Sequence, residues 1–152
     1  MKYRIKILVF ALMFPTLVVA YPSINDIATY KSTLHTNSGD GFVSDIKRTI
    51  LDFDSNRNLY LIRTEVENND ISREKWVPSS RVYKKNDVLE ILRNCEKNDG
   101  KRETILVPAG LISTCYLKGD SNDNHIWIAD VVFGYAKKIT YDSVVELKSY
   151  NR

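Results

Sequence analysis

The chain has 152 residues, of which 43% are hydrophobic and 27% charged, and its formal net charge is +3 at neutral pH. Lys2, Arg4 and Lys6 carry that excess, so the residues after position 20 hold 22 − 3 = 19 basic and 19 acidic side chains. A domain without net charge exerts no long-range attraction on nucleic acid or anionic lipid, and no basic stripe with interleaved aromatics is seen, so we expect no nucleic-acid partner.

Residues 1–20 have the pattern of a signal peptide. A basic segment is followed by an apolar run, Ile7–Ala20, and Val18 and Ala20 place small residues at the −3 and −1 positions of a cleavage site. The run is shorter than the roughly 20 residues of a spanning helix, so an uncleaved membrane anchor is the weaker alternative. No cysteine follows the run to accept a lipid anchor. We therefore expect a periplasmic or secreted domain, residues 21–152, with no stable membrane span after cleavage.

The first half of that domain is predicted to form strands after a turn at Asn37–Gly41. The clearest strand is Leu59–Glu67, in which Tyr60, Ile62, Thr64 and Val66 share one face and charged residues share the other. This alternation is typical of an antiparallel sheet with one face in water. The other two strands expected here are Arg48–Asp54 and Ile71–Ser80, the latter ending near Pro78.

One main helix is predicted over Asp87–Cys95. Its apolar positions, Val88, Leu89, Ile91 and Leu92, recur at helical spacing, and Cys95 continues the same stripe. Asp87, with Glu90 three residues on, resembles a capping box, and Asn86 is the competing N-cap. Gly100 is the expected stop.

The remainder alternates strands with turns. The expected strands are Lys101–Gly110, Leu111–Gly119, His125–Val132, Tyr135–Thr140 and Ser143–Tyr150. Because the connections are short and no repeat or linker is visible, we predict a single α+β, mainly β domain. Its core would be one curved antiparallel sheet of about seven or eight strands, resembling a half-barrel, with the main helix packed on it.

Cys95 and Cys115 are the only cysteines of the chain. An even number in an exported domain predicts a disulfide bond, which here would join the end of the helix to the sheet. A redox pair is the alternative, but the two residues are far apart in sequence and form no CxxC motif.

No local motif for metal or catalytic chemistry is found. Asp120, Asn122 and Asn124 alternate as in a calcium loop, but His125 stands where that loop needs glycine, so a polar turn is the simpler interpretation. The segment Asp52–Asn56 departs from the calcium pattern in the same way. The motifs HExxH and GxSxG and a glycine-rich phosphate loop are missing from the sequence. We therefore predict no catalytic residues, no metal site and no cofactor.

Aromatic residues are the remaining signal. Trp76, Trp127, Phe133 and Tyr135 lie on or beside predicted strands. Core packing is the simpler interpretation. The functional alternative is that they line the concave face of a sheet that one helix covers only in part, which would leave room for a ligand.

The segments VPAGLISTC and HIWIADVVFGYAKK, with an earlier cysteine after a helix, form a recognisable pattern between Trp76 and Lys138. In it the chain resembles small exported bacterial proteins of uncharacterised families with a VPAG…TC…W…FG pattern. Val132 stands where the pattern has proline. Such domains are similar to the half-barrel group related to the LolA and LolB lipoprotein carriers. The resemblance implies an antiparallel sheet curled round an apolar groove, but a fold does not determine a function.

Two functions follow as hypotheses. The first is a non-catalytic binding or interaction domain of the bacterial envelope, whose partner would be a lipid, another apolar ligand or an envelope protein. The second is a secreted hydrolase, or an inhibitor of one, acting through polar loops such as Gly119–Asn124.

Overall fold

The computed structural model describes residues 22–35, 41–67, 70–121 and 123–151, and the predicted signal peptide lies outside this part. The described chain forms one open antiparallel sheet with the spatial order β4-β3-β2-β1-β9-β8-β7-β6-β5. The strands are β1 (Ile27–Leu34), β2 (Phe42–Asp54), β3 (Leu59–Val66), β4 (Ile71–Pro78), β5 (Lys101–Val107), β6 (Gly110–Lys118), β7 (His125–Ile128), β8 (Tyr135–Ile139) and β9 (Ser143–Tyr150). The predicted fold class is confirmed, and the described sheet has nine strands rather than seven or eight.

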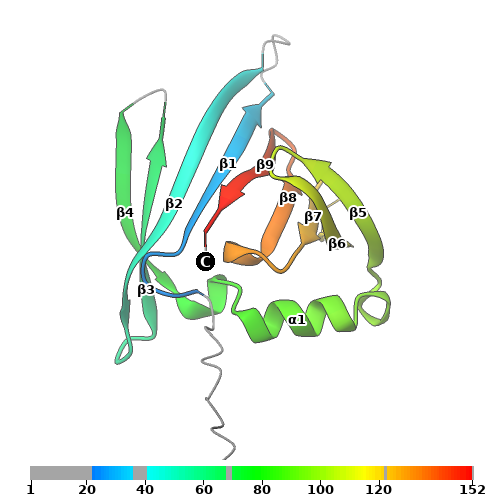
Figure 1. Cartoon of the computed structure of the whole chain (residues 1–152), viewed down its shortest axis with the longest axis horizontal. Coiled ribbons are helices and arrows are strands. Elements are labelled where there is room, and N and C mark those ends of the chain that lie inside the picture. Colours follow the sequence, from blue (N-terminus) through cyan, green and yellow to red (C-terminus); the bar gives the residue numbers. More distant parts are fainter. Residues whose placement is uncertain (1–21, 36–40, 68–69, 122, 152) are drawn as a thin grey trace, which may run out of the picture.

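The additional strand is β1, and its pairing explains the topology. Strands β1 to β4 form one meander and β5 to β9 another, and antiparallel pairing of β1 with β9 joins the two. The two ends of the described chain therefore meet in the middle of the sheet, and its edges are β4 and β5. Figure 1 shows the two groups of strands curving round a common interior.

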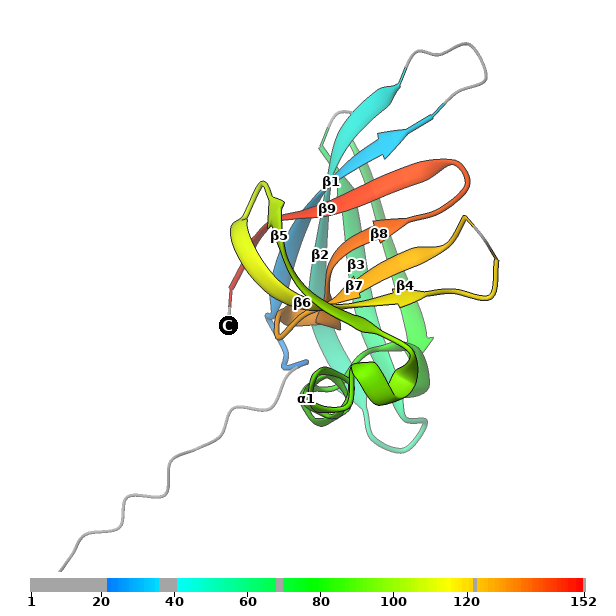
Figure 2. The same ribbon diagram turned by 90° about the vertical axis from the view of Figure 1, so that its right-hand side faces the viewer.

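The chain crosses from one edge to the other through the helical segments. It passes through η1 (Ser79–Arg81), α1 (Lys85–Arg93) and η2 (Glu96–Asn98) before entering β5. In both views α1 lies across one end of the arched sheet (Figures 1 and 2). This crossover keeps α1 at one end of the sheet, and no other described α-helix covers the concave face.

Helix α1 begins two residues earlier than the sequence pattern predicts. Lys84 is its N-cap, and Asp87 occupies the third helical position, where its carboxylate accepts a hydrogen bond from the backbone N–H of Lys84 at 3.4 Å. The predicted capping box at Asp87 is therefore wrong. Asp87 instead lies inside the first turn and accepts a hydrogen bond from the backbone N–H of the N-cap residue. A carboxylate at this position also interacts favourably with the helix dipole.

The helix packs against η3 (Val132–Gly134), a tight turn between β7 and β8. Val88 is fully buried. A Cβ atom placed on Gly134 would lie 2.9 Å from Cγ2 of Val88 and 2.5 Å from Cβ of Tyr83. Phe133 and Gly134 both have positive φ, of 64° and 76°. Glycine is thus required at position 134 for conformation and for space.

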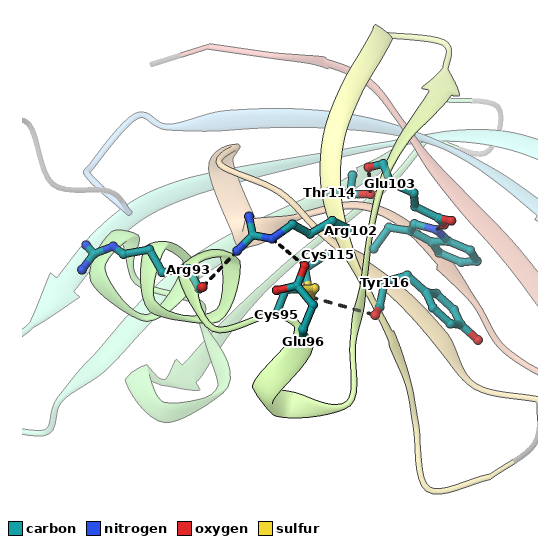
Figure 3. Close-up of a disulfide and its surroundings, with 9 residues drawn as sticks. Arg93, Cys95, Glu96, Arg102, Glu103, Thr114, Cys115 and Tyr116 are labelled. Carbon is teal, nitrogen blue, oxygen red and sulfur yellow. Dashed lines mark hydrogen bonds and ion pairs between the residues drawn. A yellow bond between two sulfur atoms is a disulfide. The ribbon is translucent and has the colours of Figure 1, made fainter.

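Cys95 and Cys115 form a disulfide bond, as predicted, with their Cα atoms 5.7 Å apart. Both residues are fully buried, and a Cβ on Gly100 would lie 2.7 Å from one sulfur and 2.8 Å from the other. Beside the bond, Arg102 donates hydrogen bonds to Glu96 and to the carbonyl of Arg93 (Figure 3). The bond therefore ties the segment after α1 to β6.

Within the described ranges, no helix is both long enough and apolar enough to cross a membrane.

Candidate functional site

The concave side of the sheet encloses a cavity of about 550 Å³. One wall comes from β2, β3 and β4 and the facing wall from β7, β8 and β9, with Tyr30 of β1 between them. The segment Arg81–Tyr83, which follows β4, and Phe133 of η3 complete the lining on the side of the helix. The volume lies within the range of about 300–1,000 Å³ that is usual for small-molecule sites.

The lining is mostly apolar. The aliphatic side chains are Ile46, Ile62, Val77, Val82, Ile126 and Val145. The aromatic ones are Tyr30, Tyr83, Phe133 and Tyr135. The hydroxyl groups of the three tyrosines and of Thr64, Thr140 and Ser143 add hydrogen-bonding capacity. Such a surface favours a ligand with a large apolar part.

Strand alternation decides which side chains reach the cavity. Ile46 and Arg48 on β2, and Lys75 and Val77 on β4, are separated by one residue and share the inward face. Lys47, between Ile46 and Arg48, points outward and forms an ion pair with Glu65 at 3.3 Å. Strands β2 and β4 therefore each have an inward set that lines the cavity and an outward set on the opposite face.

Tyr30, Tyr135 and Arg48 form a connected polar group at the deep side of the cavity. The rings of Tyr30 and Tyr135 are stacked with centroids 4.8 Å apart, and Nη1 of Arg48 donates to the hydroxyl of Tyr135 at 3.2 Å. The hydroxyl of Tyr30 donates to the carbonyl of Val132 at 3.3 Å. Burial, helped by the adjacent Tyr135, raises the pKa of Tyr30 well above its usual value, although Arg48 partly opposes the shift. Tyr30 is therefore a neutral hydrogen-bond donor at physiological pH.

Four cationic side chains line the cavity: Arg48, Lys75, Arg81 and Lys138. Among the described residues, no carboxylate lines it, and none of the four forms an ion pair with a described carboxylate. The outward face differs, because cations there pair across neighbouring strands, as in Arg63–Glu74 at 2.7 Å and Lys137–Glu146 at 2.8 Å. The positive charges of these four side chains are thus not balanced by a described carboxylate in the lining.

The four aromatic residues singled out in the sequence do not lie together. Phe133 and Tyr135 line the cavity, whereas Trp76 and Trp127 do not. Trp76 lies between Lys75 and Val77, so alternation directs it outward, where the guanidinium of Arg57 lies 5.1 Å from its ring. The alternative that placed both tryptophans on a ligand face thus does not apply to this cavity.

Trp127 follows the inward-facing Ile126, so its indole belongs to the outer face. There it hydrogen-bonds to Glu103, and its ring lies 5.1 Å from that of Tyr116. The two tryptophans were grouped with the ligand face because strand periodicity separates two faces without saying which one is concave.

The cations and Tyr30 were missed as site residues. A signal was present for Arg48, because it lies two positions before the apolar Ile50 on a predicted strand and therefore shares its face. The sequence pattern does not predict that Lys138 lines the same cavity, because Lys138 belongs to the other meander of the sheet.

The described residues of the polar loops do not form a metal-binding group. Within the described part of the chain, no group of three or more His, Cys, Asp or Glu side chains converges. Nδ1 of His125 lies 2.7 Å from the hydroxyl of Tyr116, on the outer face. At Asp54 the carboxylate accepts backbone hydrogen bonds from Asn56 and Arg57, both at 3.0 Å, as in the turn predicted there.

Comparisons of the chain with protein-family models, with curated proteins and with solved structures find no match. The candidate site therefore rests on the geometry of this chain alone.

Proposed function

We propose that the protein is an exported, non-catalytic binding domain of the bacterial envelope that holds a lipid-like ligand in the cavity of its curved sheet. The observation that carries this proposal is the 550 Å³ cavity with its predominantly aliphatic and aromatic lining. Apolar surface of this kind is favourable to cover, because each Å² removed from water contributes about 25 cal/mol.

Two features support placement outside the cytoplasm. A disulfide such as that between Cys95 and Cys115 is typical of an oxidising compartment. The N-terminal pattern of a basic segment, an apolar run and small residues before position 21 is that of a cleaved leader. Both features suit a carrier or sensor of envelope lipids.

The test uses protein that the cell has exported. The full chain is expressed with its own N-terminal sequence in a bacterium, and the exported protein is purified and analysed by native mass spectrometry. We expect added masses that are released by organic solvent and identified as lipid. The emptied protein should then bind an uncharged naphthylamine dye, whose fluorescence rises in apolar surroundings.

A matched pair of variants locates the binding. Val145 lines the cavity, and its neighbour Val144 belongs to the opposite face of β9. Val145→Trp should reduce dye binding because the indole fills the cavity, whereas Val144→Trp should not. The proposal is refuted if wild-type protein carries no lipid and binds no dye, or if the two variants behave alike while circular dichroism shows that both are folded.

A further inference from the structure

We infer that the ligand is an amphiphile with an anionic headgroup, carboxylate or phosphate, and that Arg48 binds this headgroup while the apolar tail lies against the aliphatic walls. This inference rests on the proposed function and specifies its ligand. It follows from the charge of the lining and from the local geometry around Arg48.

Arg48 is a half-buried cation that donates a hydrogen bond to an uncharged hydroxyl group. Its Nη1 donates to the hydroxyl of Tyr135 at 3.2 Å, and it has no ion pair with a described carboxylate. A guanidinium has five N–H donors in a planar fork that matches the two oxygens of a carboxylate or phosphate. A partly desolvated cation without a counter-ion is unfavourable, so an anion entering from the cavity is stabilised there.

The neighbours of Arg48 suit a bound headgroup. Its cross-strand partner on β3 is Thr64, whose hydroxyl also belongs to the cavity lining. Tyr135, which touches the guanidinium, is stacked on Tyr30 and so has a fixed position. An anion at Arg48 therefore has a charged donor beside two neutral hydroxyl groups, a combination that fixes its orientation.

The remaining cations act at longer range. Lys75 belongs to one wall, Lys138 to the other and Arg81 to the segment after β4, and all three side chains are exposed. With no described carboxylate in the lining, they make the cavity positive and raise the rate at which anions arrive. The domain as a whole has no net charge, so this effect is confined to the cavity.

The experiment measures displacement of the uncharged naphthylamine dye from the emptied wild-type protein by three ligands with the same tail. Dodecanoate and dodecyl phosphate have anionic headgroups, and dodecanol is the neutral reference. We expect at least one anion to displace the dye at about tenfold lower concentration than the alcohol. Acetate and inorganic phosphate, which have no tail, should not displace it.

Arg48→Gln tests the residue, and Lys47→Gln is its matched control. Both changes remove one positive charge from adjacent positions on β2, but Lys47 lies on the outer face in an ion pair with Glu65. Arg48→Gln should remove the preference for the anionic amphiphile over dodecanol, and Lys47→Gln should preserve it.

The outcomes separate this inference from the proposed function. If the dye binds but dodecanol competes as well as the two anions do, the cavity is a lipid site and the inference about the headgroup is wrong. Equal losses in Arg48→Gln and Lys47→Gln, or displacement by inorganic phosphate alone, would also overturn it. If nothing binds the wild-type protein, the proposed function itself fails. The comparison of ligands on wild-type protein decides the matter even if Arg48→Gln does not fold.

Discussion

Replacing Cys95 and Cys115 together by alanine should lower the free energy of unfolding by about 3 kcal/mol without abolishing the fold. The two cysteines are 20 positions apart in sequence. For a loop of that length the chain-entropy expression gives about 11 cal/mol/K, which is about 3.3 kcal/mol at 25 °C. For a domain of this size the loss corresponds to a fall in Tm of about 10 °C.

Urea denaturation followed by circular dichroism measures this difference at equilibrium. Wild-type protein treated with a reducing agent should approach the stability of the double variant, and the double variant itself should not respond to the reductant. A loss of less than about 1 kcal/mol would refute the reasoning. So would two free thiols in a titration of the unfolded, unreduced protein.

Gly100 offers a second readout of the same bond. A Cβ at this position would lie within 2.8 Å of both sulfur atoms, and within 2.7 Å of the carbonyl oxygen of Cys95. Gly100→Ala should therefore cost more stability in the wild-type protein than in the double alanine variant, where the sulfurs are gone. Equal costs in the two backgrounds would show that the close packing against the sulfurs does not matter.

Three further outcomes follow from the structure. Gly134→Ala should destabilise the protein by about 2 kcal/mol or more, because residue 134 has a positive φ and the new Cβ atom would lie 2.5 Å from the Cβ atom of Tyr83. An unchanged urea midpoint would contradict this. The raised pKa of Tyr30 means that its stabilising contribution is complete below its unfolded value of about 10 and is lost as the pH rises through the higher folded value. Tyr30→Phe should therefore weaken the decline in Tm above pH 10, and an identical alkaline profile would argue against it. The hydrogen bond from Lys148 lowers the pKa of Asp45, so this pair stabilises the fold above the unfolded pKa of about 4 and loses that contribution as the pH falls through the lower folded value. Asp45→Asn should therefore make the fall in Tm at acid pH smaller, measured at low salt, and an unchanged fall would contradict this.

Local pattern predicted most of the elements and failed where it was weak. The alternation in Leu59–Glu67 corresponds to β3, and the apolar stripe around Val88 and Ile91 corresponds to α1. Strand β1 was not recognised, because its buried positions include the small residue Ala28 and the polar Ser32, which do not stand out as an apolar face. Strand β2 begins six residues before its predicted start at Arg48, since pairing with β1 extends it.

The candidate site could be predicted only in part. Core packing was the simpler interpretation of the aromatic residues, and the alternative placed Phe133 and Tyr135 on a ligand face; both line the cavity. It grouped Trp76 and Trp127 with them, although the two tryptophans lie on the outer face. Alternation shows that neighbours on a strand face opposite ways, but the direction in which the sheet curves depends on all nine described strands.

The sequence by itself determined the features that depend on near neighbours in the chain: the alternating strands and the amphipathic helix. Only the tertiary structure decided that β1 pairs with β9, which brings the two meanders together and encloses the cavity between them. It also decided that Arg48 and Lys138, 90 positions apart, share one cavity while Lys47 and Lys137 beside them pair outward. The physical reason is that pairing between distant strands depends on the burial and hydrogen bonding of the whole sheet, and no short segment contains that information.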